Sequence, residues 1–590
     1  MLYPKENEKR ELKNLSGIWR FKIDKSNRGI EERWYEKPLE DAIPMPVPSS
    51  YNDITQDPSI RDHIGYVWYE REFYIPEHWK GKRIFLRIGS ATHSAIVWIN
   101  GRKAFEHKGG FLPFEGEITS LVSFSGENRV TIAVSNILDW TLLPPGELVE
   151  LNDPFHPPHY KFQEYYFDFY NYAGIHRPVY IYALSQNYIS DIKVVTDIEK
   201  RKGIINYEVK IVGKAEKILV SLWDKGEKIL EMEGERGTLI VEDAKFWEPS
   251  NPYLYNFKVE LFNDNLEDCY SLKVGIRTVE VKGSKFLLNG KPIYFKGFGK
   301  HEDADIRGKG YDPVIALKDF YLLKWINANS FRTSHYPYAE EIMDLADEFG
   351  ILIIDEAPAV GLNLWGSKKT FCPERISEET LKYHIQVMRE LIDRDKNHPS
   401  VVMWSVANEP ASFEKEAEDY FKRVIEETKK MDPTRPVTIV DCFSPHEKDP
   451  FESKVTKYVD VICVNRYYSW YTDPGNLEII EFQLEKDLKK WYERYKKPVF
   501  LTEYGADTIA GFHSDPPQMF SEEYQLEMIK RFNNVLDRLD FIIGEHVWNF
   551  ADFATKQEVR RVMGNRKGVF TRQRQPKLVA HYLKERWGRK

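Results

Sequence analysis

The sequence predicts a multidomain β and α/β protein: an N-terminal jelly-roll β-sandwich, an immunoglobulin-like β-sandwich and a C-terminal (β/α)8 TIM barrel. Three observations support this. The length of 590 residues exceeds that of one domain. Residues 1–185 and 186–276 form two blocks of short strand candidates separated by turn signals. Between 277 and 590 the pattern changes to strands that alternate with helices.

The first block contains short alternating strands that face a core on one side. The strand candidates cover 18–23, 65–74, 83–88, 94–99 and 130–134, with Asn100-Gly101 and Gly109-Gly110 as turn signals. The second block has candidates at 189–196, 203–211, 218–223, 228–233, 237–241 and 254–261. Their spacing fits an immunoglobulin-like sandwich, although the Cys…Trp…Cys signature is absent. We expect this second domain to act as a spacer.

Eight strand candidates alternate with helices in the last block, as in a TIM barrel. They cover residues 293–298, 330–333, 352–355, 401–407, 437–440, 461–465, 499–502 and 546–549. Asp312 followed by Pro313 predicts the N-cap and first residue of a helix that runs to residue 326. Residues 376–395 and 521–536 are further long helical candidates.

Two of these strands end in a glutamate. Residues 401–407 are mostly apolar and lead into Asn408-Glu409-Pro410, where the proline must end the strand. Residues 498–505 place Glu503 at the end of another buried strand. Glycosidases use such a carboxyl pair: one group protonates the leaving oxygen, and the other attacks the anomeric carbon or activates water. Alone, an Asn-Glu-Pro triplet is more often a strand that ends in solvent, so the second glutamate carries the hypothesis.

The other predicted strand ends are also polar or aromatic, which indicates a functional site on this face of the barrel. Some of these side chains will instead serve as structural hydrogen bonders. The set comprises His301, Glu302, Arg332, His335, Asp355, Glu356, Asp441, Asn465, Tyr467, Tyr468, Trp548 and Asn549.

The composition argues against several classes of partner. A net charge of −8 without a basic tract argues against nucleic acid. No apolar run is long enough for a transmembrane helix, and the first residues are charged where a signal peptide is apolar. We therefore expect a cytoplasmic protein that binds no membrane. The four widely spaced cysteines predict reduced thiols rather than disulfides or a metal site. An aromatic content of 14% suits sugar-binding surfaces.

Eight long motifs run through the chain. They are YNYAGIHRPV (170–179), GFGKHEDADIRGKGYD (297–312), ANSFRTSHYPYAEE (328–341), RDKNHPSVVMWSVANEP (394–410), VNRYYSWY (464–471), LTEYGADTIAGFHS (501–514), EHVWNFADFAT (545–555) and GNRKGVFTR (564–572). With these motifs the sequence resembles the β-glucuronidases of glycoside hydrolase family 2. That family has the same three-domain plan and needs no cofactor, so the resemblance implies hydrolysis of β-D-glucuronides.

The resemblance also implies the catalytic roles. Glu409 would be the general acid/base and Glu503 the nucleophile, with Tyr467 supporting the nucleophile. The family retains anomeric configuration, which predicts carboxyl groups about 5–5.5 Å apart. Glu409 then needs a raised pKa, while nearby donors should keep Glu503 ionised.

Further residues match the family's sugar contacts. Asn408 would hydrogen-bond the 2-hydroxyl, and Asp168 would reach a sugar hydroxyl from the first domain. The remaining matches are Asn465, Tyr471 and Trp548, with His335 as a possible addition.

An Asn-x-Lys motif, Asn565 to Lys567, would bind the C6 carboxylate of the sugar, with Arg561 as a helper. A cation and an amide donor suit a carboxylate. We expect a neutral sugar to be rejected because it would leave Lys567 buried and unpaired. An isolated motif of this kind would more often be a basic loop in solvent.

Two alternatives remain at this point. One is another exo-glycosidase of the family, a β-galactosidase or β-mannosidase, which the Asn-x-Lys motif disfavours. The other is a non-catalytic sugar-binding protein, which the presence of both glutamates disfavours. Residues 364–374 form a shorter loop than in some bacterial relatives, which predicts a more open site. Family resemblance suggests a homo-oligomer, either a dimer or a tetramer.

Overall fold

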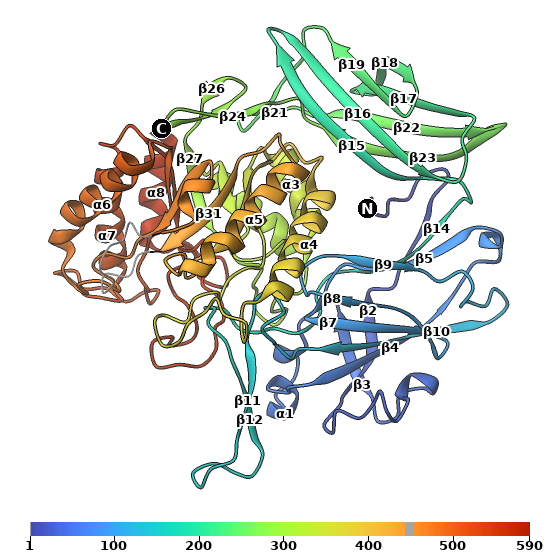
Figure 1. Cartoon of the computed structure of the whole chain (residues 1–590), viewed down its shortest axis with the longest axis horizontal. Helices are drawn as coiled ribbons and strands as arrows, with labels where there is room; N and C mark the ends of the chain where they lie inside the picture. Colours follow the sequence, from blue (N-terminus) through green and yellow to red (C-terminus); the bar gives the residue numbers. More distant parts are fainter. Residues whose placement is uncertain (1, 443–452, 590) are drawn as a thin grey trace.

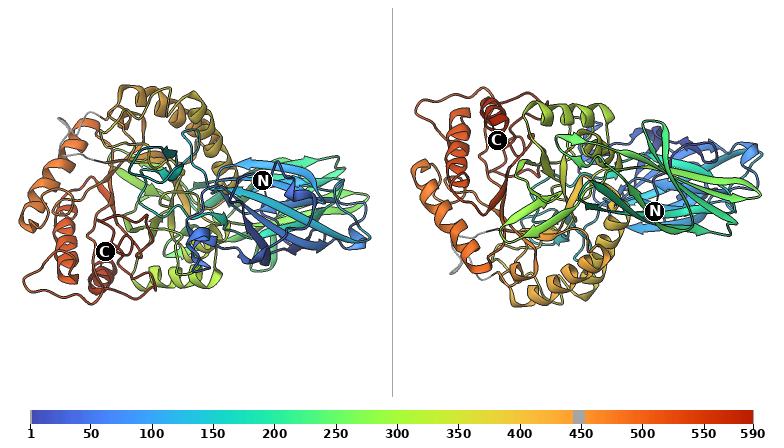
Figure 2. Two further views of the ribbon diagram at one scale, coloured as in Figure 1. Left: turned by 90° about the horizontal axis from the view of Figure 1, so that it is seen from below. Right: turned by 90° about the horizontal axis from the view of Figure 1, so that it is seen from above.

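The computed structural model describes residues 2–442 and 453–589 and contains three domains in the predicted order (Figure 1). Two β domains lie on one side of a C-terminal barrel (Figure 2). The predicted fold class is confirmed. Within the described ranges, no helix is both long enough and apolar enough to cross a membrane.

The first domain is a sandwich of two antiparallel sheets. One sheet, in the order β1-β14-β5-β9, contains β1 (Glu11–Asn14), β14 (Val179–Leu184), β5 (Arg83–Ile88) and β9 (Phe114–Glu117). The other, in the order β3-β2-β4-β10-β7-β8, contains β3 (Ile43–Val47), β2 (Gly17–Ile23), β4 (Tyr66–Tyr74), β10 (Glu127–Ser135), β7 (Ser94–Ile99) and β8 (Arg102–Lys108). Smaller elements are α1 (Pro58–Arg61), β6 (Ala91–Thr92) and β13 (Gly174–Ile175).

The second domain is the expected immunoglobulin-like sandwich. One sheet contains β15 (Tyr188–Glu199), β16 (Lys202–Val212) and β19 (Arg236–Val241). The other contains β18 (Glu227–Glu233), β17 (Lys217–Asp224), β22 (Tyr255–Asn263) and β23 (Asn265–Val274). Short strands lead to the barrel: β20 (Trp247–Glu248), β21 (Asn251–Pro252), β24 (Val279–Lys282), β25 (Lys285–Leu288) and β26 (Lys291–Pro292).

The third domain is a closed barrel of eight parallel strands. In order, these are β27 (Phe295–Gly299), β28 (Ser330–Arg332), β29 (Leu352–Glu356), β30 (Val401–Asn408), β31 (Val437–Cys442), β32 (Val461–Asn465), β33 (Val499–Glu503) and β34 (Ile542–Val547). The helices that cover them are α2 (Pro313–Trp325), α3 (Glu340–Phe349), α4 (Glu378–Asp395), α5 (Lys415–Met431), α6 (Ile480–Tyr495), α7 (Glu522–Leu536) and α8 (Leu578–Arg589). The start of α2 is as predicted, because Asp312 accepts a hydrogen bond from the backbone N–H of Val314 at 2.8 Å.

The predicted position of the eighth strand is wrong. The prediction covers 546–549, whereas β34 spans Ile542–Val547 and begins four residues earlier. The first residues of β34 were not predicted as strand because they include Gly544, and glycine is unfavourable inside a strand. Its role is packing: a Cβ atom at Gly544 would lie 2.6 Å from Cβ of Phe295 on the neighbouring β27.

The first domain shares the hydrophobic core of the barrel. Phe111, Phe167 and Phe169 belong to the same buried cluster as the barrel helices and strands. Phe167 and Phe169 are almost fully buried and flank Asp168, so packing fixes a residue of the first domain at the C-terminal end of the barrel strands.

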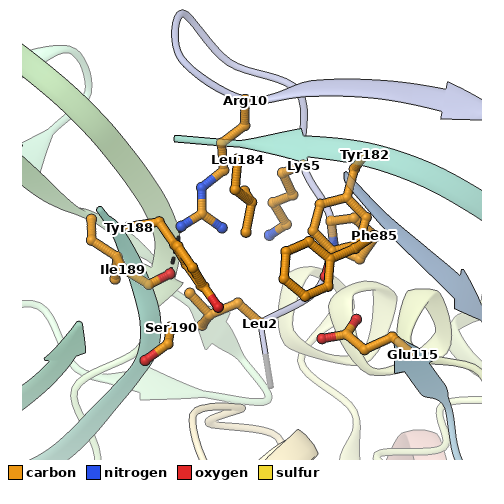
Figure 3. A pocket seen from close by; sticks show the side chains of 11 residues that line it. Leu2, Lys5, Arg10, Phe85, Glu115, Tyr182, Leu184, Tyr188, Ile189 and Ser190 are labelled. Atoms are coloured by element: carbon orange, nitrogen blue, oxygen red, sulfur yellow. Dashed lines mark hydrogen bonds between the residues drawn. The ribbon is translucent and has the colours of Figure 1, made fainter. Parts of the chain in front are cut away.

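The N-terminal segment joins the two β domains. Arg10 donates to the backbone carbonyl of Ile189 at 2.6 Å and pairs with Asp268 in the second domain. Beside this contact lies a small cavity of about 90 Å³, which includes Phe85, Tyr182 and Tyr188 in its lining (Figure 3).

A two-stranded hairpin, β11 (Glu147–Leu151) and β12 (Tyr160–Glu164), projects from the first domain away from the rest of the molecule (Figure 1). Phe155 near its tip is 91% exposed. This hairpin was not predicted from the sequence, because no residue of its two strands is buried and they therefore show no apolar face that packs on a core.

Candidate active site

Neighbouring strands bring the two predicted glutamates to one end of the barrel. Glu503 is the last residue of β33 and pairs in register with Asn465, the last residue of β32. Asn408 ends β30, and Glu409 follows it with a left-handed backbone angle φ of 49°. A non-glycine residue with such a φ needs support from its surroundings, and these residues often lie at functional sites. The fold thus places the carboxyl groups where TIM barrels hold their catalytic residues.

Donors contact both oxygens of the Glu503 carboxylate. Tyr467 donates its hydroxyl to Oε2 at 2.7 Å, and the Arg332 guanidinium contacts Oε1. His335 Nε2 lies 3.8 Å from Oε1. Glu503 is buried, and these contacts favour its ionised form.

Arg332 fixes several of these groups at once. It is fully buried at the end of β28, and its Nη1 lies 2.7 Å from Oε1 of Glu356 and 3.3 Å from Oδ1 of Asn408. A guanidinium can serve several acceptors because it presents five donors in a rigid plane. From the sequence, Arg332 is predicted only as a polar strand end, without a role in the site.

Glu409 has a different environment. It is partly exposed, and Asn465 donates to its Oε1 from Nδ2 at 2.7 Å. Thr502 donates to Asn465 Oδ1 at 2.9 Å and so fixes which end of the amide faces Glu409. Burial raises the pKa of Glu409, while Asn465 and the Arg332 charge oppose the rise. The direction agrees with the expectation for a general acid.

The expectation was that nearby hydrogen-bond donors would favour the ionised form of Glu503, but its pKa is raised above the ordinary value of a glutamate. Burial raises this pKa to about 8; the Arg332 charge opposes the rise, and the nearby Glu409 carboxylate adds to it. The two carboxyl groups are therefore close enough for the charge of Glu409 to affect the pKa of Glu503. Among the described residues, Glu503 receives a guanidinium and a phenol donor, whereas Glu409 receives one amide donor. When the pair holds one proton, these contacts favour its placement on Glu409.

Trp548 and His335 form one wall of this site. Their rings stack with centroids 4.9 Å apart. Burial lowers the pKa of His335 to about 4, so the imidazole is neutral near pH 7, and its Nδ1 lies 2.8 Å from Oε1 of Glu356. His335 therefore contacts both the Trp548 ring and the Glu356 carboxylate.

A second cluster contains the predicted carboxylate-binding residues. Arg561 donates to both oxygens of Asp168, from Nε at 2.9 Å and from Nη2 at 2.7 Å. Asn565 Nδ2 also donates to Asp168, at 2.9 Å. Lys567 is fully buried, and its Nζ lies 2.8 Å from the Tyr471 hydroxyl. The first domain and the barrel therefore both contribute to the cluster.

The structure corrects one expectation about Lys567. Asp507, buried and four residues beyond Glu503, forms an ion pair with Lys567 and lies 3.2 Å from Nη1 of Arg561. Lys567 thus has a counter-ion before any sugar binds, and a neutral sugar would not leave it unpaired. Asp507 was not predicted as a site residue from the sequence, because its partner Lys567 lies 60 residues further along the chain.

The two clusters meet at a pair of tyrosines. The rings of Tyr467 and Tyr471 lie 5.0 Å apart, and Lys567 Nζ lies 5.8 Å from the centroid of the Tyr467 ring. Tyr467 contacts the nucleophile candidate and Tyr471 contacts both cations. A carboxyl pair therefore lies beside a site that can bind an anion. All twelve residues predicted for the site belong to these two connected clusters.

Comparisons with protein families agree with this architecture. A model described as the TIM barrel domain of glycosyl hydrolases family 2 matches residues 279–590. The family's sugar binding domain matches residues 12–185, and a third model of the family matches residues 187–277.

The chain belongs to glycosyl hydrolase family 2.

Full-length relatives of this family 2 hydrolase include a β-glucuronidase of Paenibacillus borealis, which is 56% identical over 100% of this chain and 98% of its own. The human β-glucuronidase is 49% identical over 100% of this chain and 92% of its own. Among solved structures, a β-D-glucuronidase of Dictyoglomus thermophilum has a TM-score of 0.95 and 57% identity, with coverage of 100% and 99% of the two chains. A Ruminococcus gnavus β-glucuronidase in complex with D-glucaro 1,5-lactone has a TM-score of 0.93 and 42% identity, with 99% coverage of both.

Proposed function

We propose that this family 2 hydrolase is a retaining exo-β-glucuronidase. It converts β-D-glucuronides to D-glucuronate and an alcohol and uses no cofactor. The observation that carries the substrate assignment is the position of Lys567, Asn565 and Arg561 beside the carboxyl pair. The similarity to β-glucuronidases over the whole chain supports the same reaction.

In the first step Glu503 attacks the anomeric carbon and Glu409 donates its proton to the departing alcohol. The raised pKa of Glu409 supports its role as the acid. Arg332 and Tyr467 hold Glu503 through opposite oxygens, which limits its rotation and orients it for attack. The product of this step is a glycosyl-enzyme ester on Glu503.

In the second step water attacks the ester, and Glu409, now ionised, accepts the proton of that water. Bond cleavage restores the Glu503 carboxylate. Asn465 donates to Glu409 and therefore favours the ionised form needed at this stage. A carboxyl separation of about 5–5.5 Å stays a prediction of the retaining mechanism.

The cation cluster accounts for the choice of glucuronate. Lys567 and Asn565 would bind the C6 carboxylate, and Arg561 would contribute charge from the adjoining loop. Charge-assisted hydrogen bonds of this kind are stronger than those to a neutral hydroxyl. The preference over neutral sugars then comes from what the carboxylate gains, since Asp507 already pairs Lys567.

The remaining predicted residues would contact the sugar itself. Asn408 would bind the 2-hydroxyl, because its side chain is held between Arg332 and Asn465 at the tip of β30. Trp548 would line the sugar pocket, and Asp168 would reach a hydroxyl from the first domain. Asn465, Tyr471 and His335 complete the proposed set.

The experiment compares hydrolysis of an aryl β-D-glucuronide with that of the aryl β-D-galactoside and β-D-glucoside. We expect a strong glucuronide preference and loss of turnover in Glu503→Ala. A galactoside preference would keep the reaction class and overturn the substrate. Near wild-type rates for Glu503→Ala would overturn the mechanism.

Three further proposals concern the protein's setting. The four widely spaced cysteines, which predict reduced thiols, support a cytoplasmic location. The family resemblance supports a dimer or tetramer, which light scattering of the purified protein would test. The short loop at 364–374, in which Trp365 is 55% exposed, supports an open site that accepts large aglycones. Hydrolysis of glucuronides with aglycones of increasing size would test the last of these.

A further inference from the structure

Asp507 is the central contact of the cation cluster. It lies in the segment that follows β33, and its carboxylate is buried. Oδ2 contacts Lys567 Nζ and lies 3.2 Å from Arg561 Nη1, while Oδ1 accepts the backbone N–H of Arg566 at 2.7 Å. One carboxylate therefore fixes the 561–567 loop at three points.

We propose that Asp507 is a positioning residue, which holds Lys567 and Arg561 in place so that they can bind the C6 carboxylate of the sugar. This inference rests on the proposed function, because it concerns the substrate's carboxylate. Asp507 acts through the two cations and takes no part in the bond-breaking steps.

Asp507 supplies the charge that the buried Lys567 needs. Lys567 is fully buried, and a buried ammonium without a counter-ion is strongly destabilised. Burial disfavours the ionised form of Asp507 as well, but Lys567 and Arg561 hold its pKa below the ordinary value. The formal charges of Asp168, Asp507, Arg561 and Lys567 sum to zero, and each of the two cations already has a counter-ion before a sugar binds.

Asp507 also determines which hydrogen-bond donors of Lys567 remain available to a ligand. An ammonium has three N–H donors. Within the described part of the chain, Lys567 Nζ has two acceptors, Asp507 Oδ2 and the Tyr471 hydroxyl. One donor is left for a ligand. The Tyr471 hydroxyl oxygen accepts hydrogen bonds from Lys567 Nζ and, at 2.6 Å, from Arg561 Nη2. The hydroxyl proton of Tyr471 can therefore also be donated to a ligand. Asp507 thus accepts one N–H donor of Lys567 and thereby fixes the direction of the N–H donor that is left for a ligand.

Asp507 is also linked to the nucleophile through the chain. Glu503 is the last residue of β33, and only three residues separate it from Asp507. A contact from Asp507 to the 561–567 loop therefore sets the distance between the carboxylate-binding residues and the attacking oxygen. A glucuronide that is bound through its C6 carboxylate then has its anomeric carbon positioned at the attacking oxygen of Glu503.

The test is a double-mutant cycle with Asp507→Asn, Lys567→Met and the double variant, each assayed with an aryl β-D-glucuronide and the aryl β-D-glucoside. Asp515→Asn is the matched control, because Asp515 is an exposed aspartate in the same segment. For Asp507→Asn we expect kcat/KM for the glucuronide to fall about 100-fold, since one member of a buried charge pair is lost. The loss should appear mainly in KM, and the slow glucoside rate should change little.

If Asp507 acts through Lys567, the double variant should match Lys567→Met within about threefold, because coupled residues are not additive. The double variant lacks both charges of the pair, so it is informative even if Asp507→Asn does not fold. The inference would be overturned if the two single losses in kcat/KM multiplied in the double variant. An unchanged KM in Asp507→Asn, or an equal loss for the glucuronide and the glucoside, would also overturn it. A wild-type protein that prefers the glucoside would instead overturn the proposed function.

Discussion

Tyr467 donates its hydroxyl to Oε2 of Glu503 at 2.7 Å, on the oxygen opposite the one that Arg332 contacts. This bond stabilises the ionised form of Glu503 and partly offsets the effect of burial on its pKa. In Tyr467→Phe the pKa of Glu503 should rise. The nucleophile must be ionised, so the acidic limb of the kcat/KM profile should move to higher pH, with a loss of about tenfold or more at the optimum. An unshifted acidic limb in a pH-rate series would contradict the assigned role of Tyr467.

Glu409→Gln removes the proton donor without changing the size of the side chain. The loss should be large for alkyl glucuronides, whose leaving groups need protonation, and much smaller in the first step for aryl glucuronides with acidic phenols. The wild-type rate should fall as pH rises through the elevated pKa of Glu409, and this basic limb should be absent in the variant. Equal losses for both classes of leaving group in single-turnover assays would exclude Glu409 as the acid.

Arg332→Lys keeps the positive charge but removes the planar fork that reaches Glu356 and Glu503 together. One of the two buried carboxylates then loses its partner, which costs about 3–5 kcal/mol when a buried pair is broken. We expect a lower melting temperature and a large drop in kcat, measured by calorimetry and steady-state kinetics. A variant with normal stability and normal kcat would show that a point charge is sufficient at this position.

Asp168→Asn removes the charge that the first domain contributes to the site. Arg561 keeps Asp507 as a partner, so the protein should fold. We expect KM for the glucuronide to rise about tenfold, a typical cost of one lost charge-assisted hydrogen bond. Asp153→Asn is the control, because Asp153 lies in the same domain with the same 40% exposure of its side chain. A KM that changes equally in the two variants would contradict a role in substrate binding.

His398 provides a prediction for stability. Its Nδ1 lies 2.6 Å from Oδ2 of Asp347, and burial opposes protonation, but the Asp347 charge raises the pKa of His398 to about 9. An ordinary histidine has a pKa of about 6.5, so this pair stabilises the fold fully below that pH and loses its effect as pH rises to about 9. The difference in melting temperature between wild type and His398→Gln should therefore be largest near pH 6 and shrink by pH 9.5. A difference that does not depend on pH would show that His398 stabilises by packing alone.

The barrel could be predicted from the sequence because its strands are local apolar runs with clear ends. The stretch at 401–407 is fully buried in the structure, and Asn408 ends the strand directly before Glu409-Pro410. The start of β34 was not predictable in this way, since Gly544 is explained by the approach of Phe295 from a strand almost 250 residues earlier.

The site was predictable to the same extent. Glu409 and Glu503 come directly after predicted apolar runs, and most of the remaining residues lie in motifs of the family. Arg332 and Asp507 become functional only through partners far away in the chain, namely Glu503 and Lys567. A buried ion pair has no local signal in the sequence, because either member alone looks like an ordinary charged residue.

The ion pair between Asp168 and Arg561 means that the barrel depends on the first domain, although the chain is divided into separate domains. Phe167 and Phe169 pack into the core of the barrel, and Asp168 lies between them. A barrel expressed alone would expose that apolar surface and lack one wall of its own site. The barrel is therefore not an autonomous catalyst without the first domain, and exchanging the first domain between distant homologues should disturb activity as well as folding.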